Sequence, residues 1–269
     1  YNPSALYAPA VAAERALQAA RETIARSVQA NEKNVIFTSG GTESDNLAIA
    51  GYLRTVRESG DVLYSAAEHP AVKNACLDAA RLLTHTAREI PLDHRGVVDM
   101  VALEQMLGPS TRLICVMQVC NETGAVMPLQ QIVEARDRLA PSAAIHVDGV
   151  QGYLRLPFSM RSLKVQSYAV SAHKVHGPKG VGALVLRDGH RIQPMLPGGG
   201  QQQNLRSGTE NTSGIAGFAA AVQNFPQEAA QQLLPLKKAA FDGLTSHISG
   251  LRVLGPLPDE EDAAPHILF

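Results

Sequence analysis

Residues 35–57 read VIFTSGGTESDNLAIAGYLRTVR, and this stretch decides the fold. The apolar run Val35–Thr38 predicts a buried strand, and the spacing from about Thr42 to Arg57 predicts a helix. Two glycines, Gly40 and Gly41, join the two elements in a tight turn. A strand that passes through a short glycine turn into a helix is the repeating unit of a sheet covered by helices.

The same alternation continues along the chain and predicts an α/β fold with a mainly parallel sheet and helices on both faces. Further strands are expected at 61–66, 87–90, 112–119, 143–147, 165–170 and 181–186, and further helices at 9–29, 70–83, 101–107, 128–139, 211–225 and 227–248. The connection between the last two strands is too short for a helical crossover, so those strands should be antiparallel.

The two ends of the chain suggest a domain organisation. Residues 192–210 are rich in Gly and Gln and predict an extended loop, while 251–254 and 266–269 are apolar and predict strands of a second unit. We therefore expect a segment of a longer protein. Its parts would be an N-terminal helical segment (1–30), a large domain (31–225), and a linking helix with the start of a truncated small domain (226–269).

Composition is that of an ordinary soluble globular protein, with 45% hydrophobic and 18% charged residues. A net charge of −1 argues against binding to nucleic acid or to an anionic membrane. Nothing in the given sequence resembles a signal peptide, and no apolar run reaches the roughly 18 residues that a membrane span needs. Cys76, Cys115 and Cys120 form no metal-ligand pattern, and their odd number argues against a disulfide framework. A reducing cytoplasm is the expected location.

The glycine turn after the first strand has two interpretations. Glycines allow close approach to an anion, and a helix N-terminus presents free N–H groups, so Gly41 and Thr42 are candidate phosphate ligands. A tight turn with Thr42 or Ser39 as the helix cap is equally consistent with the pattern.

Polar residues also follow other predicted strands. Asp148 ends one strand and suits a partner for a heteroaromatic nitrogen, with Gln151 beside it. His69 is placed to stack on a flat ring and to move protons, and Asn121 to bind a ring substituent. Each also fits a structural cap or turn, and for Asp148 alone the cap is the better interpretation.

Lys174 lies in the segment Ser171-Ala172-His173-Lys174, just after a predicted strand. An imine-forming lysine must lose its proton before it attacks a carbonyl. Ser171 and His173 alternate around Lys174 and are candidate phosphate ligands, although a solvated lysine is the ordinary alternative. Phosphate cradle, ring stacker, ring-nitrogen acid and imine-forming amine together make up a pyridoxal-phosphate site.

The segments SGGTESDN, EHPAV, NETG, HVDGVQ, SAHKVHGPKG and GGGQ…RSGTEN, in this order, resemble the cysteine desulfurases of the NifS/IscS type, which are pyridoxal-phosphate enzymes of the class-V aminotransferase family. The resemblance covers nearly the whole chain. It implies the aspartate-aminotransferase fold (fold type I), with a seven-stranded sheet in the large domain and a small domain that is incomplete here.

The resemblance also implies a role for each candidate residue. Lys174 matches the lysine that holds pyridoxal 5'-phosphate as a Schiff base, and His69 the imidazole stacked over the ring; both are the expected catalytic groups. The remaining cofactor-binding residues would be Asp148 at the ring nitrogen, Gln151 and Asn121 near the ring hydroxyl, and Gly41, Thr42, Ser171 and His173 at the phosphate. Thr209 matches a threonine that reaches the phosphate of the other subunit, which implies a homodimer.

The implied reaction converts L-cysteine to alanine and passes sulfur to an enzyme cysteine as a persulfide, for a sulfur acceptor such as an iron–sulfur assembly protein. The family's persulfide cysteine and its carboxylate-binding arginine match no residue here. Selenocysteine lyase is an alternative that would keep the same residues, and a non-catalytic dimer scaffold is another. A nucleotide-binding domain is disfavoured because the phosphate-loop lysine and the dinucleotide fingerprint are absent.

Overall fold

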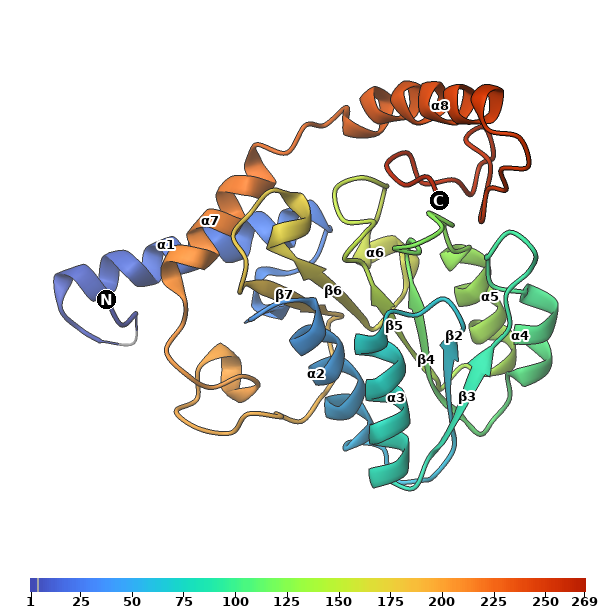
Figure 1. Ribbon diagram of the computed structural model, residues 1–269. Helices are drawn as coiled ribbons and strands as arrows, with labels where there is room; N and C mark the ends of the chain where they lie inside the picture. The colour runs from blue at the N-terminus through green and yellow to red at the C-terminus, as the bar shows by residue number, and fades with distance from the viewer. Residues whose placement is uncertain (4) are drawn as a thin grey trace.

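A seven-stranded sheet forms the centre of the molecule (Figure 1), in a computed structural model that describes residues 1–3 and 5–269. Its strands are β1 (Val35–Thr38), β2 (Asp61–Ser65), β3 (Thr86–Ile90), β4 (Thr111–Met117), β5 (Ala144–Asp148), β6 (Ser167–Ser171) and β7 (Gly182–Leu186). They are arranged in the order β1-β7-β6-β5-β4-β2-β3. The predicted mainly parallel α/β sheet is confirmed, including the strand at 86–90.

One strand runs against the others. β7 pairs antiparallel with both β6 and β1, whereas β6, β5, β4, β2 and β3 pair in parallel. The antiparallel pairing expected for the last two strands is confirmed. Because β7 reverses direction on both sides, β1 runs the same way as the five parallel strands. The carboxyl ends of β1, β2, β4, β5 and β6 therefore meet at one edge of the sheet.

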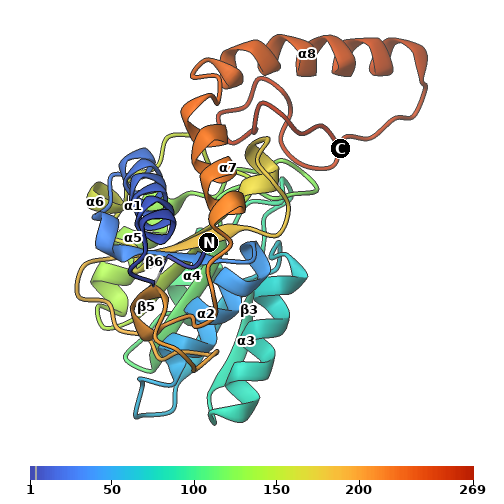
Figure 2. The same ribbon diagram turned by 90° about the vertical axis from the view of Figure 1, so that its left-hand side faces the viewer.

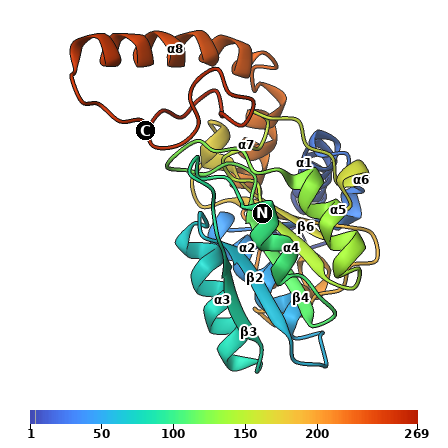
Figure 3. The same ribbon diagram turned by 90° about the vertical axis from the view of Figure 1, so that its right-hand side faces the viewer.

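Helices cover both faces of the sheet, as Figures 2 and 3 show from opposite sides. One face carries α2 (Gly41–Leu53) and α3 (Pro70–Leu82). The other face carries α1 (Ala8–Ser27), α4 (Met100–Met106), α5 (Leu129–Leu139), α6 (Met160–Leu163) and α7 (Thr212–Gln223). Side chains alternate between the faces, so that Leu63 packs in the larger core with Ile24, while its neighbour Val62 packs in a second core with Val72.

The C-terminal part extends beyond the sheet, where α8 (Ala229–His247) lies at the top of all three views. The strands expected at 251–254 and 266–269 are wrong, because neither segment is in a strand. A single backbone hydrogen bond joins them, from Leu254 N to Phe269 O at 2.9 Å. Prolines at 256, 258 and 265 lie between the two segments and lack the N–H that would extend a strand ladder from either one. The division into three parts remains a prediction.

Two smaller differences concern short elements. The sequence pattern did not indicate α6, and α2 ends at Leu53 rather than near Arg57. The loop expected at 192–210 is present, with one 3₁₀ turn at Gln202–Asn204. No helix in the described part of the chain is long and apolar enough to cross a membrane.

Candidate active site

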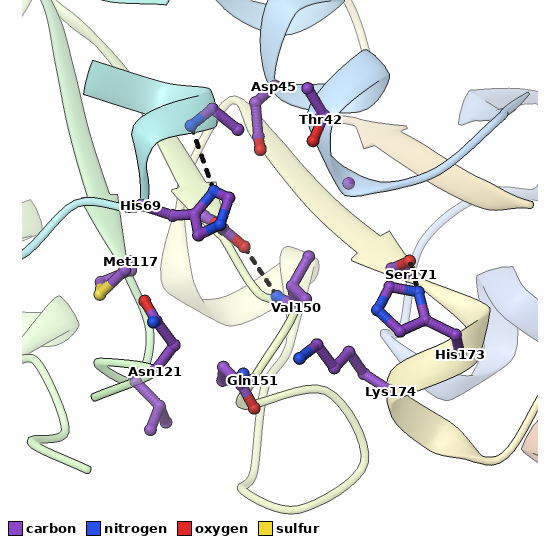
Figure 4. A pocket seen from close by; sticks show the side chains of 14 residues that line it. Thr42, Asp45, His69, Met117, Asn121, Val150, Gln151, Ser171, His173 and Lys174 are labelled. Carbon is purple, nitrogen blue, oxygen red and sulfur yellow. Dashed lines mark hydrogen bonds between the residues drawn. The ribbon is translucent and has the colours of Figure 1, made fainter. Parts of the chain in front are cut away.

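A pocket of about 290 Å³ opens at the edge of the sheet where the carboxyl ends of the strands meet. Figure 4 shows the side chains that converge on it. All of the predicted site residues except Thr209 line this pocket. Its lining consists of Gly41, Thr42, Asp45, His69, Ala71, Met117, Val119, Asn121, Asp148, Val150, Gln151, Ser171, His173 and Lys174.

One end of the pocket is the N-terminus of α2. The helix begins after Gly40, and no side chain caps it, so the interpretation of Thr42 or Ser39 as the cap is wrong. Its first N–H groups are free for an anion. A Cβ atom added to Gly41 would lie 2.7 Å from Val150 Cγ2, so only glycine leaves this part of the wall clear.

Ser171 and His173 complete the same end of the pocket. Ser171 Oγ and His173 Nδ1 lie 2.8 Å apart and hydrogen-bond to each other. Burial lowers the pKa of His173, and the charges of Lys174 and Lys179 lower it further. The imidazole is therefore neutral around pH 7, and the nearby positive charge of Lys174 favours an anion at this place.

Lys174 enters the pocket from the 3₁₀ turn Ala172–Val175, which directly follows β6. Its side chain points into the pocket toward Gln151 (Figure 4). The backbone at this position is held in place because Arg155 Nη2 donates a hydrogen bond to the Lys174 carbonyl. The amine thus projects from a fixed backbone into the space between the α2 end and the floor of the pocket.

His69 caps a helix and also lines the pocket. It precedes α3, and its Nδ1 accepts a hydrogen bond from Ala71 N at 3.1 Å, which caps the helix. The ring also lines the pocket (Figure 4). Because Nδ1 is an acceptor, the proton of the neutral ring is on Nε2.

Asp148 forms the floor of the pocket and is 6% exposed. Its Oδ1 accepts a hydrogen bond from Val150 N at 2.8 Å, so it stabilises a turn as well as facing the pocket. The pKa of Asp148 is raised to about 7, first by burial and then by the negative charge that Asp45 would carry if it were ionised, against the hydrogen bond from Val150 N. A cation placed beside this carboxyl would favour its ionised form.

Two buried acids near the pocket were not identified from the sequence. Asp45 lies one helical turn after Thr42, and this i, i+3 spacing was the available signal. Glu68 precedes His69 and is 7% exposed; its Oε1 accepts hydrogen bonds from Ser65 Oγ and Met117 N, each at 2.6 Å. Burial raises the pKa of Glu68 to about 8, against the hydrogen bond from Ser65.

Thr209 and the cysteines lie elsewhere. Thr209 is exposed in the loop before α7 and does not line the pocket of its own chain. Cys76, Cys115 and Cys120 are all buried and form no disulfide among the described residues. Burial raises the pKa of Cys115 well above its usual range, which makes this thiol a poor nucleophile.

The sequence model of the aminotransferase class-V family matches residues 2–267. The chain belongs to this family. A cysteine desulfurase of Cereibacter sphaeroides is 36% identical over 255 residues, which cover 94% of this chain and 65% of the relative. The chain therefore spans less than two thirds of the length of this curated relative.

Solved structures of this family share the fold. A NifS-like protein is 32% identical with a TM-score of 0.92, over 100% of this chain and 73% of that chain. A structure described as SspA in complex with cysteine is 33% identical with a TM-score of 0.82, over 90% of this chain and 70% of that chain. The resemblance to NifS-type cysteine desulfurases and the fold type that it implied are confirmed.

Proposed function

We propose that this chain carries the cofactor-binding part of a pyridoxal-phosphate-dependent cysteine desulfurase. The observation that carries the proposal is the convergence, in one pocket, of the Lys174 amine, the Asp148 carboxyl and the uncapped N-terminus of α2. These groups suit an aldehyde, a ring nitrogen and a phosphate, respectively. The named relatives are cysteine desulfurases, and one solved relative is described with cysteine, which supports L-cysteine as the substrate.

The residues fit the cofactor along its whole length. Gly41 leaves room beside Val150, and the free N–H groups of α2 with Thr42, Ser171 and His173 would hold the phosphate. Asp148 would accept a hydrogen bond from the ring nitrogen, and His69 would stack on the ring. Gln151 and Asn121 would lie near the ring hydroxyl.

When bound, pyridoxal phosphate supplies an electron sink for the bond that breaks at the substrate α-carbon. Lys174 would hold the cofactor through Nζ and, when released by the substrate amine, would take up the α-proton at the same atom. His69 Nε2 carries a proton that it can exchange with the substrate, because Nδ1 is occupied by Ala71 N. Asp148, ionised beside the ring nitrogen, would keep that nitrogen protonated.

The sulfur-accepting group and the partners are also proposals. Cys76, Cys115 and Cys120 are buried, so we place the persulfide on none of them. The exposed loop with Thr209 supports a homodimer in which Thr209 reaches the partner's phosphate site. We propose a sulfur acceptor protein, such as one of iron–sulfur assembly, as the further partner. Three unpaired cysteines support a reducing cytoplasm as the location.

The central test uses the full-length protein and the substitution Lys174→Ala. We expect the visible absorption band of the bound cofactor to disappear, and release of alanine and sulfide from L-cysteine to fall by about 10²–10⁴-fold or more. The exposed Lys33, which pairs with Asp188 and does not line the pocket, provides the control, and Lys33→Ala should leave both signals unchanged. A band that persists in Lys174→Ala would contradict the proposal. A normal band without alanine release in the wild type would indicate a scaffold instead of an enzyme.

A further inference from the structure

A buried hydrogen-bonded chain beneath the pocket links three elements of the fold. Asp45 Oδ1 on α2 lies 3.1 Å from His146 Nε2 on β5, and His146 Nδ1 lies 2.8 Å from Ser167 Oγ on β6. Asp45 and His146 are each 1% exposed and Ser167 is 2% exposed. Asp45 also borders the pocket that contains Asp148, so the chain begins at the proposed ring site and ends inside the sheet.

We propose that Asp45 is a positioning residue that acts as a neutral carboxylic acid: it donates to His146, which in turn donates to Ser167. This series of hydrogen bonds joins α2 to the sheet next to the proposed ring site, and it places no second negative charge beside Asp148. The inference rests on the proposed function, because the charges of Asp45 and Asp148 matter when Asp148 faces a protonated ring nitrogen.

The surroundings of Asp45 favour its neutral form. The titratable groups around it are His146 and Asp148 on β5, Glu68 and His69 before α3, and Cys115 on β4. Asp148, once ionised, would repel an ionised Asp45. None of these groups is a lysine or an arginine, and His146 is the one group that hydrogen-bonds to the Asp45 carboxyl within residues 1–3 and 5–269.

An ion pair between Asp45 and His146 is the alternative. It would require two charges without access to water, and their mutual attraction seldom offsets that desolvation. Burial raises the pKa of Asp45 well above its usual range and lowers the pKa of His146 to about 4. Both shifts favour the neutral pair.

The neutral pair fixes the direction of the hydrogen bonds. A neutral imidazole has one N–H and one acceptor nitrogen. When the Asp45 hydroxyl donates to Nε2, the imidazole proton is on Nδ1 and is donated to Ser167 Oγ. Of the two aspartates that line the pocket, Asp45 then stays neutral and Asp148 ionises when a cationic ring binds.

Infrared difference spectroscopy tests the protonation state directly. We compare the full-length wild type with Asp45→Asn and with Asp148→Asn at pH 7, each with and without cofactor. Asp45→Asn should remove one carbonyl band of a protonated carboxyl from the wild-type spectrum, and that band should persist in Asp148→Asn. The protonated Glu68 keeps its own band in all three proteins. If Asp45→Asn removes ionised-carboxylate bands instead, the proposal is overturned. The measurement on cofactor-free protein remains informative even if the cofactor does not bind, so it separates this inference from the proposed function.

Two variants of the loaded protein test the positioning role. Asp45→Asn keeps a neutral donor to His146, so the cofactor dissociation constant should change by less than about twofold, and the pH midpoint of its absorption band by less than about 0.3 units. If Asp45 were ionised, removing its charge in Asp45→Asn would shift that midpoint by about one unit or more. This result would overturn the proposal. Asp45→Leu has a similar size but no donor, and it should lower the Tm and weaken cofactor binding by about tenfold.

A melting temperature and a cofactor affinity equal to the wild type in Asp45→Leu would overturn the positioning role. If Asp45→Leu does not fold, Asp45→Asn and the infrared comparison still decide the protonation state. Ser167→Ala serves as a matched variant at the far end of the chain. It should weaken cofactor binding less than Asp45→Leu, because it leaves the contact between α2 and β5 intact.

Discussion

Gly41 shows how one missing side chain shapes the pocket. A Cβ atom at this position would meet Val150 Cγ2 at 2.7 Å, and Val150 lines the pocket. In Gly41→Ala we expect Val150 to move into the space proposed for the cofactor. The cofactor dissociation constant, measured by absorbance titration, should rise about tenfold, or about 1.4 kcal/mol.

The control for this substitution is Gly243→Ala on α8. A Cβ atom there meets nothing within 4 Å, and alanine favours a helix by about 1 kcal/mol over glycine. The cofactor affinity of this variant should equal that of the wild type. If Gly41→Ala also leaves the affinity unchanged, Gly41 does not serve as the open wall of the site.

Glu68 makes the stability of the cofactor-free protein depend on pH. Its pKa in the folded protein is about 8, above the value of about 4.3 for an unfolded glutamate. The folded state therefore binds more protons, and stability is complete below the unfolded pKa and is lost as pH rises toward 8. Glu68→Gln keeps an oxygen for Ser65 and Met117 but does not titrate.

We expect the stability advantage of Glu68→Gln over the wild type to increase from about pH 5 to about pH 8. The slope should reach about 1.4 kcal/mol per pH unit and should level off above pH 8. Urea unfolding at several pH values measures this difference. A difference that is constant with pH would mean that Glu68 is ionised in the folded protein.

Among the helices, α5 is joined to the sheet by one buried cation. Arg136 is 3% exposed and donates from Nη1 to Ala143 O at 2.8 Å and from Nη2 to Lys164 O at 3.0 Å. These carbonyls belong to the segments that lead into β5 and β6. The strands that position Asp148 and Lys174 thus start from segments held by the same side chain.

Arg136→Ala should lower the free energy of unfolding by about 3 kcal/mol, because it removes the bond to the buried Ala143 carbonyl and the bond to the partly buried Lys164 carbonyl. Arg138 on the same helix is exposed and pairs with Glu104, so Arg138→Ala should cost less than about 1 kcal/mol. Chemical denaturation of both variants checks the contrast. Equal effects would show that Arg136 does not anchor the strands.

For the whole molecule, the proposed homodimer predicts that two differently mutated subunits restore one complete site when they pair. If Thr209 serves the partner's site, a mixed dimer of one Lys174→Ala subunit and one Thr209→Ala subunit contains one intact site. That site has its own Lys174 and the partner's normal threonine. We expect Thr209→Ala alone to weaken cofactor binding about tenfold, and the mixed dimer to regain wild-type affinity at half of its sites.

The purified mixed dimer is titrated with cofactor beside each parent variant. If Thr209 served its own subunit, the mixed dimer would contain no intact site and would show no recovery. A protein that remains monomeric in sedimentation would also contradict the shared site.

The local sequence was sufficient to predict the strands of the seven-stranded sheet, the helices α2 and α3, and the residues that follow these strands. The reason is that alternating polarity and glycine turns act within a few residues, and the carboxyl ends of parallel strands share one edge. The local pattern therefore predicts that Lys174, Asp148 and His69 lie at one site. The apolar segments 251–254 and 266–269, by contrast, were predicted as strands, and neither forms one.

The tertiary structure decided the features that depend on distant contacts. Burial between α2 and β5 brings Asp45 to His146, 101 positions apart, and burial between β2 and β4 brings Glu68 to Met117. The same packing sets the pKa values of these acids, which no local pattern encodes. Sequence thus determined which side chains stand at the edge of the sheet, and packing determined which of them are charged and what space lies between them.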